Sequence, residues 1–276
     1  MKHILVLSFL FLLNTAAIHS QTTSVEVSLQ KVIKGSFQFF QVDELGALYV
    51  YTSIGQLKKY NSNLDSLAVF NEIKRYGKLF SIHAQNPLRT LLYFKDFTTV
   101  LAIDRMMQPL QKIDLRKLNL FQVRAIAPSY DNKIWVYDEQ NSKIKKINFE
   151  GSIEFESTDL RLVFDEKLSP INIFESEGNL CLYDPNNGIY VFDYYGGFKK
   201  KIVATDLSHF HTWMGNFIGF QDGNLHLMGN NVADHRKYEL PSTLKGAKQY
   251  LCSFNLLYKL VESGIEQYSF KINQSR

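Results

Sequence analysis

The sequence predicts an all-β fold built from a repeated unit. Short runs in which apolar and polar residues alternate recur along the chain, separated by turns of polar residues or glycine. This two-residue period is typical of β-strands, and no strong helical segment lies between the runs. Aromatic residues, which favour strands, make up 14% of the chain.

The clearest unit is a hairpin over residues 132–151, which reads NKIWVYDEQNSKIKKINFEG. Its two strands flank a polar turn, and similar hairpins follow Gly46, Arg89, Asn179 and Asn224. The first aliphatic residue of each hairpin recurs at intervals of 43, 43, 46 and 45 residues, at Leu48, Leu91, Ile134, Leu180 and Leu225. A four-stranded unit of this length is typical of a β-propeller blade.

Each hairpin lies between an apolar run and a more polar run. The apolar runs suit the innermost strands of the blades, over residues 37–42, 79–83, 123–127, 171–174 and 217–220. The polar runs suit the outermost strands, over residues 66–70, 110–114, 152–156 and 200–203. Lysines on the third and fourth strands are expected to face water and to discourage edge-to-edge pairing.

A sixth blade is predicted to combine both ends of the chain. Residues 249–255, 256–261 and 264–273 supply three strands, and Val25 to Gln30 supplies the fourth. This pairing closes the ring and hides two edges, so we predict a six-bladed β-propeller. The interval from Leu225 to Leu256 is only 31 residues, which predicts a missing or shortened outermost strand in blade five. The alternative is a five-bladed ring with an elaborated last blade.

Residues 1–20 are predicted to be a signal peptide. Lys2 precedes an apolar run from Ile4 to Leu13, and small or polar residues lead to Ser20. The apolar run is too short to span a bilayer. Residues 21–276 are then expected to form a single propeller domain. We expect an exported protein, periplasmic or secreted, without a transmembrane segment after signal removal, with association with the outer membrane through a partner as an alternative.

The charge and the cysteine content limit the classes of partner and of covalent cross-link that the sequence supports. The formal net charge is +4, and no basic block is long enough to indicate a nucleic-acid partner. Cys181 and Cys252 lie within apolar runs more than a blade apart, so we expect two buried free thiols.

The blade pattern resembles the six-bladed propellers of the NHL and YWTD-like group. The closest matches are residues 132–151 and 45–61, although the YWTD tetrapeptide itself is absent. The resemblance covers nearly all of the chain after the signal peptide. It implies architecture only, because members of this group include binding scaffolds, lactone hydrolases and lyases.

No complete catalytic set is apparent, so the catalytic residues are unknown and no cofactor is predicted. The sequence has no Gly-x-Ser-x-Gly motif and no Gly-rich phosphate loop. His209 and His211, with His226 or His235, could form a three-histidine metal site, or all four could make ordinary hydrogen bonds.

Propeller hydrolases of the lactonase type hold a metal in the central channel through Glu, Asn and Asp of the inner strands. The resemblance implies Asn172, Glu175 and Asp222 for such a site, and thus an alternative function as a metal-dependent hydrolase or lyase. Carboxylates are scarce on the predicted inner strands, which otherwise offer Gln38, Gln41, Gln85 and Arg124, whereas hard cations prefer several carboxylates. We therefore favour a protein without a metal and without enzymatic activity.

Two aromatic segments are candidate binding surfaces. Tyr194, Tyr195 and Phe198 lie in and beside a turn between the third and fourth strands of blade four, and His211 and Trp213 precede blade five. Exposed aromatic residues can anchor a protein or stack on sugars, although packing between blades is the other reading. We predict a binding scaffold of the bacterial cell envelope with a protein partner, or a glycan as the alternative.

Overall fold

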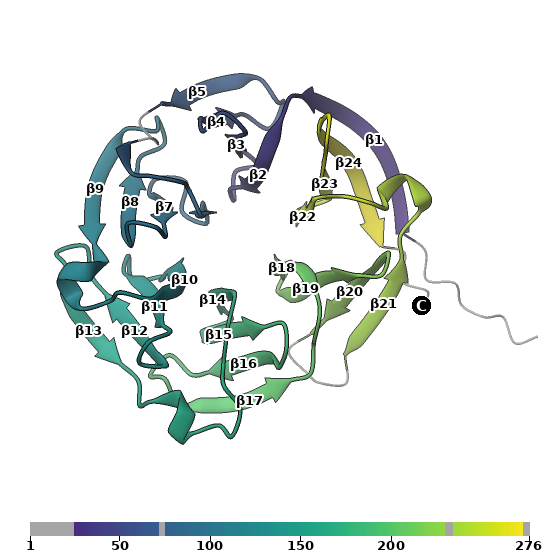
Figure 1. Ribbon diagram of the computed structural model, residues 1–276. Helices are drawn as coiled ribbons and strands as arrows, with labels where there is room; N and C mark the ends of the chain where they lie inside the picture. The colour runs from purple at the N-terminus through teal and green to yellow at the C-terminus, as the bar shows by residue number, and fades with distance from the viewer. Residues whose placement is uncertain (1–24, 72–74, 230–233, 273–276) are drawn as a thin grey trace, which may run out of the picture.

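The structure is a computed structural model that describes residues 25–71, 75–229 and 234–272. Six four-stranded antiparallel sheets surround a central axis (Figure 1), which confirms the predicted six-bladed β-propeller. The helical segments of these ranges include three short 3-10 turns, η2 (Leu115–Leu118), η3 (Leu160–Leu162) and η4 (Ser242–Leu244). None of the described helices is long and apolar enough to cross a membrane. The predicted signal peptide lies outside the described residues.

Five blades are each built from four consecutive strands that run from the axis outwards. Blade 1 comprises β2 (Phe37–Val42), β3 (Leu48–Thr52), β4 (Leu57–Tyr60) and β5 (Ser66–Phe70). Blade 2 comprises β6 (Ser81–His83), β7 (Thr90–Phe94), β8 (Thr99–Ile103) and β9 (Pro109–Asp114). Blade 3 comprises β10 (Val123–Pro128), β11 (Ile134–Asp138), β12 (Lys143–Ile147) and β13 (Ile153–Glu156). Blade 4 comprises β14 (Asn172–Ser176), β15 (Asn179–Asp184), β16 (Gly188–Phe192) and β17 (Phe198–Ile202).

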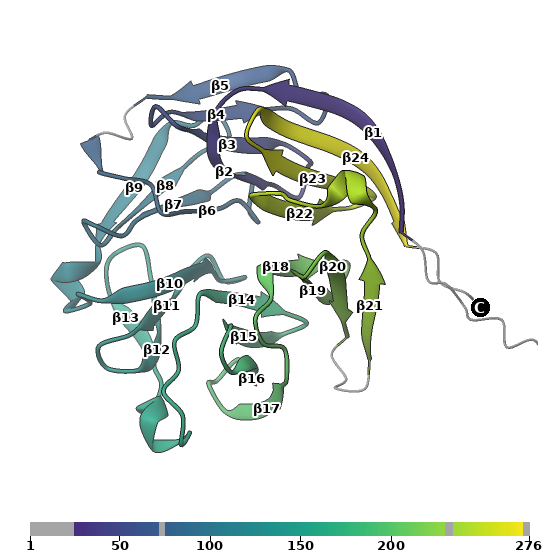
Figure 2. The ribbon, with the colours of Figure 1, turned by 45° about the vertical axis from the view of Figure 1, so that its right-hand side comes forward.

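Blade 6 closes the ring with both ends of the chain, as predicted. From the axis outwards its strands are β22 (Gln249–Ser253), β23 (Leu256–Val261), β24 (Gly264–Ile272) and β1 (Val25–Lys34). β1 runs antiparallel to β24 over its whole length, with one register shift between Leu29 and Lys31. Figures 1 and 2 show β1, in purple, beside β24, in yellow. The N-terminal strand therefore covers an edge that β24 would otherwise expose.

Blade 5 differs from the prediction. It comprises β18 (Ser208–Trp213), β19 (Asn216–Gln221), β20 (Asn224–Met228) and β21 (His235–Glu239), so its outermost strand is present. The apolar run 217–220 is the second strand rather than the innermost one. Leu225 therefore lies on a third strand, whereas Leu256 lies on a second strand. The interval from Leu225 to Leu256 is short because these two residues lie on strands that are not equivalent in their blades.

Apolar side chains pack mainly between neighbouring blades. Three buried tyrosines on second strands also donate hydrogen bonds to backbone carbonyls at the start of the next blade. Their hydroxyls bond the carbonyl oxygens of Val123, Leu168 and Leu207 at 2.8, 3.2 and 2.9 Å, from Tyr93, Tyr137 and Tyr183 respectively. Burial raises the pKa of Tyr137 and of Tyr183 to about 12, so these donors keep their protons at neutral pH.

Two lysines of β12 are buried, so the expectation that they face water was wrong. The ammonium nitrogen of Lys145 lies 2.9 Å from Asp138 Oδ2, and that of Lys146 lies 3.1 Å from Asp131 Oδ2. Lys146 also lies over the Trp135 ring, 4.9 Å from its centre. β12 is the third of four strands, so β13 and the adjacent blade cover it, and the long side chains reach partners inside the protein.

Candidate functional site

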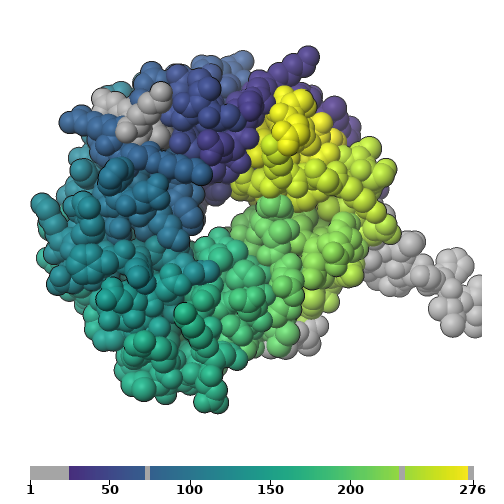
Figure 3. All heavy atoms as spheres, in the orientation of Figure 1, coloured from purple at the N-terminus to yellow at the C-terminus, as the bar shows by residue number. Residues whose placement is uncertain are grey.

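The innermost strands of all six blades line a cavity at the axis, with a volume of about 760 Å³. Figure 3 shows this hollow at the centre of the ring. Successive side chains of a strand point to opposite sides, so each innermost strand presents part of its residues to the axis. The cavity is thus built from six short segments far apart in the sequence.

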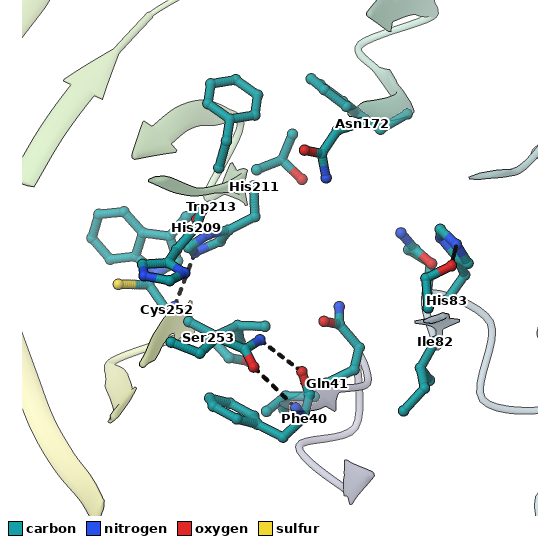
Figure 4. A pocket seen from close by; sticks show the side chains of 18 of the residues that line it. Phe40, Gln41, Ile82, His83, Asn172, His209, His211, Trp213, Cys252 and Ser253 are labelled. Carbon is teal, nitrogen blue, oxygen red and sulfur yellow. Dashed lines mark hydrogen bonds between the residues drawn. The ribbon is translucent and has the colours of Figure 1, made fainter. Parts of the chain in front are cut away.

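Three amide side chains face the cavity from different blades. Gln41 is on β2, Gln85 follows β6 and Asn172 begins β14. Figure 4 shows the amides of Gln41 and Asn172 pointing into the open space. Within the described part of the chain, none of these three amides has a hydrogen-bond partner. Gln249 differs, because its amide bonds the backbone N–H and C=O of Phe40 at 3.0 and 2.8 Å and joins blade 6 to blade 1.

Burial lowers the pKa of all three cavity histidines, His83, His209 and His211, and so favours their neutral forms. The Nε2 atom of His83 lies 2.9 Å from Ser81 Oγ. His211 donates from Nδ1 to the His209 carbonyl at 2.7 Å and accepts the Cys252 N–H at Nε2 at 3.0 Å, a pattern that fixes its tautomer. Burial lowers the pKa of His83 and of His211 to about 4 each.

The cavity lining contains neither lysine nor arginine among the described residues. Its two carboxylates are those of Asp43 and Glu44. Asp43 is buried and accepts the backbone N–H groups of Leu45 and Ala47 at 2.9 and 2.8 Å. This carboxylate therefore stabilises the turn that follows β2, and the cavity carries little charge of its own.

The residues of the alternative metal site do not come together in the cavity. Of the three, Asn172 lines the cavity, whereas Glu175 and Asp222 are not part of its lining. Glu175 instead accepts hydrogen bonds from Ser129 Oγ, the Tyr130 N–H and Trp135 Nε1, at 2.7, 2.9 and 2.5 Å. These bonds join β14 to the turn and second strand of blade 3.

The four clustered histidines also separate into two pairs. His209 and His211 lie on the innermost strand β18, whereas His226 Nδ1 lies 2.9 Å from His235 Nε2 between β20 and β21. No group of three His, Cys, Asp or Glu side chains in the described ranges is arranged to hold a metal ion.

Both cysteines are free and buried, as predicted. Burial raises the pKa of the Cys181 thiol to about 12 and raises that of Cys252 as well. A thiol with a raised pKa is a poor nucleophile, so neither cysteine is a candidate for catalysis.

The predicted aromatic residues lie in three places. Tyr195 is 85% exposed, and the Tyr194 ring beside it lies 4.8 Å from Tyr130 of blade 3. Phe198 packs instead against Phe164, with ring centres 4.8 Å apart. Trp213 lines the cavity together with His211, and its indole N–H donates to a backbone carbonyl at 2.8 Å. Sequence reasoning placed these five residues in two groups and missed Tyr130.

One face of the ring carries a set of exposed apolar residues. In an antiparallel blade, the turn between strands one and two and the turn between strands three and four open on the same face, here called the turn face. In five of the six blades the first of these turns carries a large apolar residue, with exposed fractions between 59% and 74%. We call this set the apolar ring; it comprises Leu45, Leu88, Tyr130, Met214 and Phe254.

The apolar ring surrounds one mouth of the cavity. Met214 and Phe254 are also part of the cavity lining. On the opposite face, large exposed apolar residues lie at the turn between strands two and three in two blades, as Ile54 and Phe97, and in connections between blades, as Phe121, Leu162 and Val203.

No family model matches the sequence, and no curated protein matches it. Solved propeller structures are similar in fold. Virginiamycin B lyase from Staphylococcus aureus is 11% identical, with a TM-score of 0.58 over 89% of this chain and 99% of that one. A Bacteroides fragilis protein described as exported is 10% identical, with a TM-score of 0.61 over 93% and 98%. The WD40 domain of Neurospora crassa Pan2 is 12% identical, with a TM-score of 0.59 over 91% and 97%. At these identities the likeness shows the fold alone.

Proposed function

We propose that the protein is an exported, non-enzymatic scaffold that binds a protein partner of the cell envelope through the apolar ring. The observation that carries this proposal is the exposure of a large apolar residue at the same turn in five blades. Large exposed apolar and aromatic side chains, repeated at one turn of successive blades around a cavity mouth, are suited to anchoring a protein partner. Burying one of these side chains in an interface is worth roughly 1.5–3 kcal/mol.

The ring is held in place before any partner binds. The backbone N–H of Tyr130 is bonded to Glu175, and Asp43 holds the turn that carries Leu45. A rigid anchor loses little conformational entropy on binding, which favours affinity. Tyr195, on an outer turn of the same face, extends the aromatic surface.

Export rests on the predicted signal peptide at residues 1–20. The similar propeller from Bacteroides fragilis is described as exported, which supports the same location for this chain. We do not propose the metal-dependent hydrolase, because only Asn172 of its three implied ligands lines the cavity.

Site-specific photo-crosslinking in envelope extracts tests the scaffold. A photoreactive residue at position 130 or 254 should capture one reproducible partner, and the same residue at position 54, on the opposite face, should not. With the partner identified, Tyr130→Ser should weaken binding about tenfold, as expected for an interface hot spot. Ile54→Ser is the matched control, because Ile54 is 70% exposed and lies on the other face. Equal capture from both faces, or unchanged affinity of the Tyr130 variant, would contradict the proposal.

A further inference from the structure

We propose that the central cavity binds an uncharged, hydroxyl-rich molecule, a neutral saccharide, through the amides of Gln41, Gln85 and Asn172. This site lies inside the cavity, deeper than the apolar ring at its mouth, and its use of the three amides goes beyond the docking of a protein.

The first argument is the state of the amides. The neighbouring Gln249 amide and Asp43 carboxylate are hydrogen-bonded within the protein, whereas the amides of Gln41 and Asn172 are half-buried and that of Gln85 is exposed, so all three are accessible to a ligand. Gln41, Gln85 and Asn172 have no side-chain partner within the described residues, yet they reach one cavity from three blades. A side-chain amide both donates and accepts hydrogen bonds. A hydroxyl group also donates and accepts hydrogen bonds. Several amides around one cavity can therefore bind a molecule that carries several hydroxyl groups.

The second argument is charge. An anionic ligand would meet no lysine or arginine in the described lining, and the pKa values of His83 and His211 are too low for either ring to carry a positive charge at neutral pH. A cation would find only Glu44, since Asp43 is bonded to its own turn. Burying an unpaired charge is costly, so the lining selects an uncharged ligand.

The third argument is size and the apolar part of the lining. The volume of about 760 Å³ is within the range of small-molecule sites. Phe80, Phe174 and Trp213 supply aromatic surface beside the polar groups. A sugar ring has apolar C–H faces and polar edges, and this combination of aromatic and amide side chains matches both.

Saturation-transfer NMR with a panel of neutral mono- and disaccharides, and the corresponding uronic acids, tests the proposal on the whole protein. We expect at least one neutral saccharide to receive saturation, and its uronic acid to bind at least tenfold more weakly. Gln41→Leu and Asn172→Leu should each weaken binding about tenfold, because a hydrogen bond left unmade in the cavity costs that much. Gln38→Leu is the matched control, since Gln38 lies on the same strand, is exposed and does not line the cavity.

Thermal melting of each variant separates loss of binding from loss of folding. No saturation of any neutral saccharide, tighter binding of the uronic acids, or equal effects of Gln38→Leu and Gln41→Leu would overturn the saccharide site. The cavity variants should leave photo-crosslinking at position 130 unchanged, and Tyr130→Ser should leave saccharide binding unchanged. Failure of this proposal is therefore distinguishable from failure of the scaffold.

Discussion

His211 shows how one side chain serves both packing and the cavity. Both ring nitrogens are engaged with backbone groups, so the imidazole joins β18 of blade 5 to β22 of blade 6. The ring also stacks on Phe220. Burial disfavours the charged imidazolium, and protonation would also replace the acceptor Nε2 by a donor that faces the Cys252 N–H, so the neutral form is the stable one here.

This arrangement predicts how stability depends on pH. The pKa of His211 is about 4 in the folded protein and about 6.5 in an unfolded chain. Between these values the unfolded state binds the proton and the folded state does not, so the free energy of unfolding is complete above pH 6.5 and falls as the pH drops towards 4. We expect His211→Gln to reduce the loss of stability between pH 7 and pH 5 by about 2 kcal/mol.

Urea unfolding of both proteins at pH 8, 7 and 5 provides the measurement. The two proteins should differ by a constant amount between pH 8 and pH 7, which serves as the internal control. Parallel stability curves down to pH 5 would show that His211 does not carry this dependence.

At the scale of the elements, the hairpins were predictable and β18 was not. In blade 3 every strand alternates or is apolar and the turns are short, so residues 132–151 contain the information for their own pairing. β18 has a register shift between Ser208 and His211, and His209 has a positive φ of 51°. This breaks the two-residue period that sequence reasoning depends on.

The dependence on a regular two-residue period also limited the prediction of the candidate site. Gln41, Gln85 and Asn172 could be named from the sequence because they lie on or beside predicted inner strands. Arg124 was named on the same grounds, yet it pairs with Glu139 at 2.7 Å and does not line the cavity. Which alternate face of a short, half-buried strand points to the axis depends on contacts with the adjacent blades. Those contacts involve residues far apart in the sequence.

Glu175 gives a prediction for the junction of blades 3 and 4. Removing this carboxylate in Glu175→Ala leaves two side-chain donors and one backbone N–H without their acceptor, so the free energy of unfolding should fall by about 2–3 kcal/mol. Glu150→Ala, at an exposed turn position of blade 3, should change it by less than about 0.5 kcal/mol.

Melting temperatures measured with calcium and with a chelator distinguish the role of Glu175 in joining blades 3 and 4 from a role as a metal ligand. If Glu175 joins the blades, the melting temperature of the native protein should be the same with added calcium and with chelator. A calcium-dependent rise in the native protein that Glu175→Ala abolishes would instead identify a metal ligand, because a ligand that binds only the folded state stabilises it.

At the scale of the whole molecule, closure determines whether the five consecutive blades form a ring at all. Each blade buries apolar residues against its two neighbours, and blade 6 completes the contacts of both blade 5 and blade 1. Val25 and Val27 of β1 pack against the cluster shared by blades 5 and 6, and Ile33 packs against the one shared by blades 6 and 1. The N-terminal strand thus contributes to two interfaces as well as to one sheet.

Deleting residues 22–34 should therefore do more than remove an edge strand. Without β1, the edge of β24 is unpaired from Gly264 to Ile272, and both interfaces lose apolar contacts. We expect the cooperative melting transition of the truncated protein, followed by circular dichroism, to disappear or to move down by more than 10 °C, since a loss of 1 kcal/mol already shifts a protein of this size by roughly 2–4 °C. A synthetic peptide of residues 24–36 added in excess should restore part of the transition, and a scrambled peptide should not. The peptide can pair and pack as β1 does without the covalent link to β2. Recovery with the peptide would therefore show that closure itself stabilises the ring. A truncated protein that melts like the intact one would show that closure by β1 contributes little to stability.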